Sequence, residues 1–190
     1  MTHPIERTIR YAQYQSLAFD CDLLLWRPRS WYGHIIARAT DGPYSHISAV
    51  LHWEGSLWQV GYEESKGGYG SPLQVAVQRW PGCIDVLRVT VEFDKKIVSE
   101  SLRTRLGWDY KWSYIRTMAM LHAPFVRWVD WSRKAMQNAE RKTAGGVCSS
   151  HVASAFAESR IQFQTDIEPS QINPNHIYRS AITHTIGTLV

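Results

Sequence analysis

The order of apolar and polar residues along the chain predicts a small sheet enclosed by helices. Short apolar or alternating runs that end at turn residues are typical of strands, and apolar residues three or four positions apart are typical of helices. The expected strands span residues 22–26, 46–53, 57–64 and 83–93. The expected helices span residues 5–19, 31–40, 98–107, 112–142 (interrupted at Pro124) and 148–159, and residues 66–72 and 169–175 are expected to be loops. Helices at both ends of a small antiparallel sheet are typical of the α+β class.

One hairpin carries the most specific local prediction. The runs HISAVLHW and LWQVGYEE flank an acid–glycine pair at residues 54–55, which is a hairpin signal. A two-residue turn pairs Trp53 with Ser56, and counting back along both strands pairs His46 with Glu63. Directly opposed residues share a face, with Cβ atoms roughly 5 Å apart. A turn longer by one residue would move the carboxylate to the other face.

Composition indicates one globular domain. The chain has 190 residues, of which 44% are hydrophobic and 20% are charged, so we expect a single domain over residues 1–190 with a Trp- and Arg-rich helical insertion at about residues 112–142. The net charge of +4 is mild and includes no block of like charges, and no nucleic-acid-binding motif is present, so we expect no nucleic-acid partner. Nothing in the sequence fixes an oligomeric state.

The number of cysteines and the composition of the N-terminal segment indicate in which cellular compartment the protein is expected. Three cysteines, Cys21, Cys83 and Cys148, are too few for a disulfide framework, and none has zinc-ligand spacing. We therefore expect no metal and no other cofactor. The first twenty residues mix charged and polar types, unlike a signal peptide, so we expect a cytoplasmic protein or one delivered by a phage or a secretion system.

Cys148 is the first candidate for chemistry. Gly145 and Gly146 precede it, and an expected helix begins at it. A thiol at a helix start lies beside unpaired N–H groups and the positive end of the helix dipole, which lower the pKa of a thiol. The alternative is a buried structural cysteine, because free cysteines are among the most buried residues. The local sequence leaves both interpretations open.

A thiol nucleophile needs an imidazole base, and the base needs an orienting partner. Among eight histidines, His46 begins a strand directly after a turn, where its side chain can reach an exposed site. Glu63 is the expected orienter, and Gln59, on the same face of its strand, is the alternative. A solvated carboxylate beside a loop is the other interpretation of Glu63.

At this point the sequence resembles the papain-like NlpC-type amidases, in their circularly permuted YiiX/YaeF-like branch, where the histidine precedes the cysteine. Five segments in family order carry the resemblance and together span residues 20–160: DLLLW at 22–26, YSHISAV at 44–50, YEE followed by SPL at 62–73, LGWDYKWSY at 106–114 and VCSSHV at 147–152. The sequence departs from the family pattern at Cys21, Asp109 and Ser150, which lie beside the expected catalytic residues and do not replace them.

The resemblance implies a permuted papain-like fold in which a small antiparallel sheet or barrel packs with helices. It implies that Cys148 is the nucleophile, His46 the general base and acid, and Glu63 the orienter. Tyr110 would help to form the pocket, and we expect Tyr44 and Gln59 to contact the substrate as well.

The expected activity is hydrolysis of an amide through a thioester acyl-enzyme, with a peptide, and in particular a cell-wall peptide, as the first choice of substrate. A second interpretation is a lipid-acting acyltransferase similar to lecithin:retinol acyltransferase, because residues 118–142 combine Met, Phe and Trp with Arg and Lys as an interfacial helix does. A membrane partner is not favoured, since Pro124 interrupts that face. A non-catalytic binding module on the same fold is the third interpretation.

Overall fold

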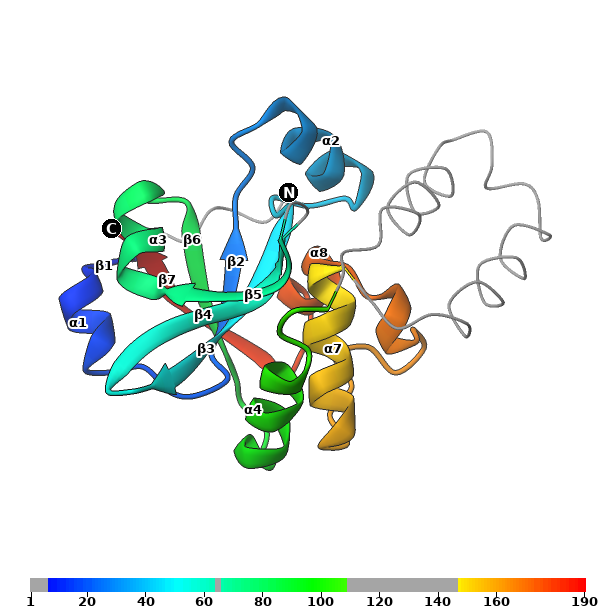
Figure 1. Ribbon diagram of the computed structural model, residues 1–190. Coiled ribbons are helices and arrows are strands. Elements are labelled where there is room, and N and C mark those ends of the chain that lie inside the picture. Colours follow the sequence, from blue (N-terminus) through cyan, green and yellow to red (C-terminus); the bar gives the residue numbers. More distant parts are fainter. Residues whose placement is uncertain (1–6, 64–65, 109–146) are drawn as a thin grey trace.

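The computed structural model describes residues 7–63, 66–108 and 147–190 (Figure 1). Seven strands form one sheet in the order β1-β7-β6-β2-β3-β4-β5. Neighbouring strands are antiparallel except β1 and β7, which are parallel, so the sheet is mixed rather than purely antiparallel. The strands are β1 (Thr8–Ile9), β2 (Leu23–Trp26), β3 (His46–Trp53), β4 (Ser56–Glu63), β5 (Gly67–Pro72), β6 (Ile84–Val89) and β7 (Thr183–Leu189).

Helices cover both faces of this sheet, as the α+β prediction requires (Figure 1). Helices α1 (Tyr11–Gln15) and α3 (Leu73–Arg79) contribute to the core on one face. The core on the other face takes residues from α4 (Lys95–Thr104), α7 (Cys148–Glu158) and α8 (Pro174–Tyr178). The remaining elements are α2 (Trp31–Ala39), which follows β2, and the 3₁₀ turn η1 (Pro169–Gln171).

Strand β3 contributes side chains to the cores on both faces of the sheet. Ile47, Ala49 and Leu51 are fully buried in the core beneath α7, whereas Val50 lies in the core beneath α3. Successive side chains of a strand point to opposite faces, and a strand that is covered on both faces is a continuous apolar run. His46 begins this run, and its backbone position is therefore fixed by one of the most buried strands of the molecule.

The predicted hairpin is confirmed. Trp53 pairs with Ser56 across a two-residue turn, and the two turn residues, Glu54 and Gly55, have φ values of 50° and 76°. Positive φ at both central positions is the mark of a type I′ turn, whose twist matches that of the flanking strands. The register that follows from this turn determines which β4 side chains share a face with His46.

Several elements differ from the sequence prediction. Residues 67–72 of the segment expected to be a loop form the edge strand β5, because their backbone pairs with β4. Gly68 packs so closely that a Cβ atom there would lie 2.2 Å from the Arg105 carbonyl oxygen. The helix expected at residues 5–19 is reduced to β1 and α1. Helix α3, helix α8 and strand β7 were not predicted, and the expected insertion at 112–142 lies outside the described residues.

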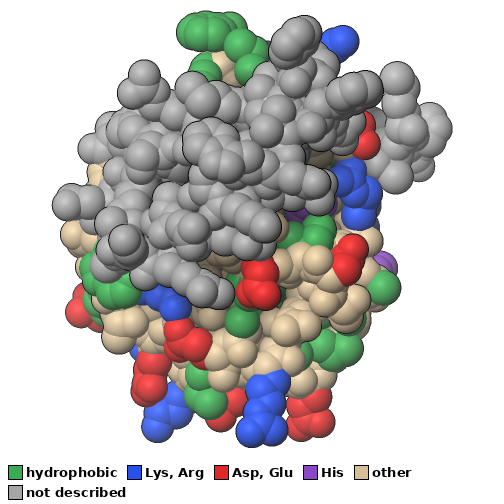
Figure 2. All heavy atoms as spheres, turned by 90° about the vertical axis from the view of Figure 1, so that its right-hand side faces the viewer, with side chains coloured by type: hydrophobic (Ala, Val, Ile, Leu, Met, Phe, Trp, Pro, Cys, Tyr) green, Lys and Arg blue, Asp and Glu red, His purple; other side chains and the backbone are tan. Residues whose placement is uncertain are grey.

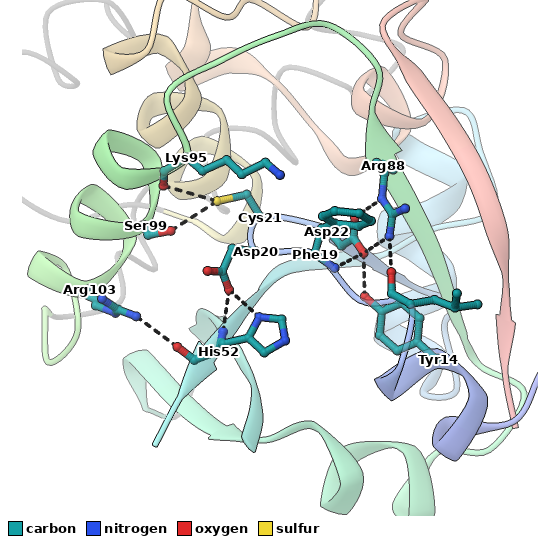
Figure 3. Close-up of polar contacts among 11 residues, drawn as sticks. Tyr14, Phe19, Asp20, Cys21, Asp22, His52, Arg88, Lys95, Ser99 and Arg103 are labelled. Carbon is teal, nitrogen blue, oxygen red and sulfur yellow. Dashed lines mark hydrogen bonds and ion pairs between the residues drawn. The ribbon is translucent and has the colours of Figure 1, made fainter. Parts of the chain in front are cut away.

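The entry to β2 is anchored by a buried carboxylate (Figure 3). Asp22 accepts two hydrogen bonds of 2.7 Å from Arg88, one from the Tyr14 hydroxyl at 3.0 Å and one from the Phe19 backbone N–H at 3.1 Å. The preceding residue, Cys21, has a φ of 70°, the left-handed region that glycine adopts without strain. A residue other than glycine therefore holds a left-handed backbone conformation at the entry to β2.

The surface carries charges of both signs. Figure 2 shows basic and acidic side chains interspersed over the part of one face that grey atoms leave visible. This distribution agrees with the mild net charge of +4. Within the described residues, helices that combine the length and the apolar character needed to cross a membrane are absent.

Candidate active site

A cavity of about 430 Å³ brings together four of the six predicted site residues. Cys148, His46, Gln59 and Glu63 all line it. They come from three elements, α7, β3 and β4, so the sheet and the helix that packs on it assemble the site between them. The fold therefore places these residues, which are far apart in the sequence, around one cavity.

Cys148 is the first residue of α7. Val147 before it is extended and buried, and the Ser150 hydroxyl accepts a hydrogen bond from the Val147 N–H at 3.0 Å while donating to the Val147 carbonyl at 3.1 Å. Ser150 therefore fixes the backbone on the N-terminal side of the cysteine. The N–H groups of the first helical turn have no partners within their own helix and favour negative charge at the helix start.

Burial outweighs the helix start in setting the charge of this thiol. Removal from water raises the pKa of Cys148, while backbone hydrogen bonding from Ile47, Ser149 and Cys148 itself, and the Ser149 side chain, lower it. The expectation of a lowered thiol pKa is not met, because the side chain is 92% buried and desolvation penalises the thiolate. The raised pKa favours the neutral thiol form of Cys148.

The imidazole of His46 is neutral as well. Burial lowers its pKa to about 4, and the nearby charge of Glu63 opposes that shift. The Trp26 ring packs edge-on against it with ring centroids 5.9 Å apart. A neutral imidazole is the form that accepts a proton, so His46 is available as a base at any pH well above 4.

Glu63 lies where the hairpin register places it, at the end of β4. The observed pairing runs from Trp53–Ser56 to Ser48–Gly61, and two more residues along the same register bring His46 opposite Glu63. The carboxylate forms an ion pair with Lys66. Among the described residues no hydrogen bond joins it to His46, and its effect on the imidazole acts through charge.

Gln59, the alternative orienter, is held in a different network. Its amide Nε2 donates to the Ser71 hydroxyl at 2.9 Å, and its Oε1 accepts from the Ser48 hydroxyl at 3.3 Å. The Trp26 indole N–H donates to the same Ser48 hydroxyl at 3.1 Å. Gln59 therefore ties β3 to β5 below the site, and Glu63 is the candidate that acts on His46.

Tyr69 is a site residue that the sequence prediction missed. It pairs with Gly61 in the sheet and lines the cavity. Burial raises the pKa of its phenol, the nearby Glu63 carboxylate and Cys148, when the latter is a thiolate, raise it further, and a hydrogen bond from Gln59 opposes them. The phenol is therefore neutral and close to three of the predicted residues. Only recognition of β5 as a strand would have placed Tyr69 on this face.

Tyr44 does not contact the cavity. It is 98% buried, and its hydroxyl donates at 2.7 Å to Asp85 in the core. Asn175 of α8 accepts from the Tyr44 N–H at 3.1 Å and donates to its carbonyl at 2.9 Å and to Thr40 at 2.7 Å. Tyr44 therefore fixes the segment that leads into His46, which corrects its predicted role in substrate binding. Tyr110 lies outside the described residues.

The other cysteines differ from Cys148. Cys21 is buried, its sulfur lies 3.4 Å from the Ser99 hydroxyl (Figure 3), and burial raises its pKa to about 11. It does not line the cavity, whereas Cys83 does. No three His, Cys, Asp or Glu side chains in the described part of the chain are grouped so that they could hold a metal ion.

The fold is similar to that of a solved structure, the metalloprotein yiiX from Escherichia coli O157:H7, with a TM-score of 0.53 and 17% sequence identity. The match covers 89% of this chain and 96% of that chain. That protein is of the YiiX/YaeF group, so the similarity of fold agrees with that part of the resemblance noted in the sequence. The NlpC-like amidase assignment and the permuted papain-like arrangement stay predictions. No protein-family model and no curated protein matches the chain.

Proposed function

We propose that the chain is a cysteine hydrolase of permuted papain-like type that cleaves an amide through a thioester. One observation carries the proposal: a cysteine at a helix start lines the same cavity as a neutral imidazole and the carboxylate that acts on it. The order of histidine, acid and cysteine in the chain is that of the permuted NlpC-like family. Members of one fold perform many reactions, so these side chains, rather than the fold, support the activity.

The acylation step begins from two neutral groups. The Cys148 sulfur attacks the carbonyl carbon of the substrate while His46 takes the thiol proton, and the carbonyl oxygen becomes an oxyanion. The Cys148 backbone N–H at the start of α7 is a donor for this oxyanion. When the C–N bond breaks, the imidazolium gives its proton to the departing amine, which leaves an acyl group on the sulfur.

Deacylation repeats the steps with water as the nucleophile. His46 takes a proton from water, the hydroxyl attacks the thioester carbonyl, and the proton returns to the sulfur as the acid product leaves. Glu63 stabilises the imidazolium that forms in both halves, because its negative charge raises the pKa of His46. Tyr69, a neutral phenol near Cys148, is a further donor within the cavity.

The substrate class of first choice is a peptide amide, including bacterial cell-wall peptides, by analogy with NlpC-type enzymes. The neighbour in structure is named a metalloprotein. The described residues of this chain do not fit a resident metal ion, because their potential ligands are not grouped, and no step above uses one.

Trapping of the acyl-enzyme tests the proposal. Incubation with 4-nitrophenyl butyrate should release a burst of 4-nitrophenolate, and mass spectrometry should place a hydroxylamine-sensitive butyryl group on Cys148. Cys148→Ala should abolish the burst, and His46→Ala should slow it by about 10²- to 10⁴-fold, the usual contribution of a general base. Cys83→Ser is the matched control, because that thiol lines the same cavity and should not matter. Acylation of Cys83 alone, or hydrolysis unchanged in Cys148→Ala, would refute the assignment.

A lipid acyl substrate is the second candidate, and one observation favours it. Trp31 and Ile35 on α2 are 77% and 53% exposed, and they flank Tyr32, Gly33 and Ile36, which line the cavity. An exposed apolar pair at a cavity mouth suits a membrane surface. Co-sedimentation with vesicles should fall in Trp31→Ser if lipid is the substrate and stay at background in both proteins if it is not.

A further inference from the structure

Two arginines meet on one tryptophan in the wall of the cavity. The Arg29 guanidinium carbon lies 4.8 Å from the centre of the Trp80 ring, and that of Arg79 lies 5.4 Å from it. Arg29 also donates a hydrogen bond to the Arg79 carbonyl at 3.5 Å. All three residues line the cavity that holds Cys148.

The other charges of the cavity wall are already paired. Arg27 forms a two-pronged ion pair with the buried Asp85, at 2.9 and 3.0 Å, and Lys66 pairs with Glu63. Among the described residues no carboxylate lies within ion-pair distance of Arg29 or Arg79. Two positive charges held near one ring repel each other, and an anion that contacts both reduces that repulsion.

The chemistry of these side chains suits an anion. A guanidinium offers donors in a planar fork that matches a carboxylate or a phosphate. Stacking on an indole ring holds a guanidinium in place and limits the conformational entropy lost on binding. Arg29 precedes α2 and Arg79 ends α3, so two separate elements hold the pair and a ligand between them would bridge both.

We infer that Arg29, Trp80 and Arg79 form a subsite for an anionic group, a carboxylate or a phosphate, on the substrate of this cavity. The inference names the substrate class of the same site and in that respect rests on the proposed function. With a neutral acyl group, no carboxylate of the described residues would balance the charges of Arg29 and Arg79. The enzyme would therefore prefer acyl groups that carry a negative charge over neutral ones of equal length.

Calorimetric binding to Cys148→Ala, which has no thiol for acyl transfer, tests the subsite without turnover. The ligands are glutaranilic acid, with a free carboxylate, and pentananilide, its neutral counterpart with the same number of acyl carbons. We expect glutaranilic acid to bind about tenfold more tightly, since Arg29 and Arg79 are exposed and ionic contacts at exposed sites have modest strength. The preference should shrink between 50 and 500 mM NaCl. The phosphate monoester of 4-hydroxybutyranilide is the third ligand, and its dissociation constant relative to that of glutaranilic acid shows which anion fits.

Charge-removing variants complete the test. Arg29→Gln and Arg79→Gln, added singly and together, should each reduce the preference and together abolish it. Arg38→Gln is the matched control, because Arg38 is an exposed arginine of α2 that does not line the cavity, and it should leave the preference intact. Equal dissociation constants for the charged and neutral anilides, or a preference that persists in both single variants and the double variant, overturn the subsite. A preference for the anion together with no acyl-enzyme in the trapping experiment refutes the proposed function and leaves the subsite standing.

Discussion

Replacing His151 should stabilise the protein, and the gain should grow as the pH falls. This histidine lies one helical turn after Cys148 and is 97% buried. Within the described part of the chain neither ring nitrogen has a hydrogen-bond partner, and the ring packs against Tyr62 with centroids 4.6 Å apart. In His151→Phe a ring of similar shape keeps that packing and removes two buried polar atoms that lack partners.

The magnitude follows from the pKa. Burial, together with the nearby charge of Arg105, lowers the pKa of His151 from 6.5 to about 3. The unfolded chain therefore takes up a proton at a pH where the folded chain does not, so stability falls as the pH drops through 6.5 toward 3. Between pH 7 and pH 5 this loss is about 2 kcal/mol for these two pKa values. Removal of unpaired buried nitrogens adds about 1 kcal/mol at both pH values.

Urea unfolding of wild type and His151→Phe at pH 7 and pH 5 measures the effect. Urea is the right denaturant because guanidinium chloride would screen the charge of Arg105. The variant should be more stable by about 1 kcal/mol at pH 7 and about 3 kcal/mol at pH 5. The depressed pKa of His46 acts equally in both proteins and cancels in the difference. His34→Phe, at an exposed position of α2, is the control and should show no such change with pH.

A stability difference between wild type and His151→Phe that is the same at pH 5 and pH 7 would refute the reasoning, because it would mean that the imidazole is protonated equally in folded and unfolded chains. His151→Leu covers the case in which the phenyl ring fits poorly against Tyr62. Its absolute stability is expected to be lower than that of the Phe variant, but its pH dependence should be the same.

Three other variants address the site. In wild type the acid limb of the pH profile of acylation should have its midpoint near pH 4, the pKa of His46, which the charge of Glu63 raises. Glu63→Gln removes that charge, so the pKa of His46 and the midpoint of the limb should both fall. A shift of the midpoint to higher pH would contradict this. Tyr69→Phe should slow acylation about tenfold and leave the midpoint of thermal unfolding unchanged, as expected if the hydroxyl acts as a hydrogen-bond donor. A lower midpoint with an unchanged rate of acylation would indicate that Tyr69 has a structural role instead. Gly42→Ala should lower the free energy of unfolding by about 1–3 kcal/mol in urea, since its Cβ would lie 2.3 Å from Asn175; wild-type stability would show that Asn175 moves freely.

The parts of the fold that the sequence predicts are those governed by local chemistry. Glu54-Gly55 determines a turn whose register carries through eight residues of each strand to His46 and Glu63. The apolar run at β2 and the helix that begins at Cys148 are also visible locally. In each case the signal lies within a few positions of the element that it predicts.

The parts that the sequence does not predict depend on distant contacts. Strand β5 contains three glycines and no apolar alternation, and it is a strand only because β4 offers its edge. Tyr69 was missed for that reason. Tyr44 was expected to contact the substrate, whereas Asp85, 41 positions along the chain, holds it in the core. The charge state of Cys148 is likewise a property of burial, which local sequence does not determine.

The hydrogen bonds between Asn175 and Tyr44 have a consequence for folding during synthesis. Asn175 holds Tyr44 across a separation of 131 positions, and Tyr44 leads directly into His46. During synthesis the β3–β4 hairpin is made first and Cys148 much later. Asn175, which fixes the segment before His46, follows after Cys148. The segment that leads into His46 is therefore fixed only after residue 175 has been added, and the cavity that His46 and Cys148 line takes its final form late in synthesis.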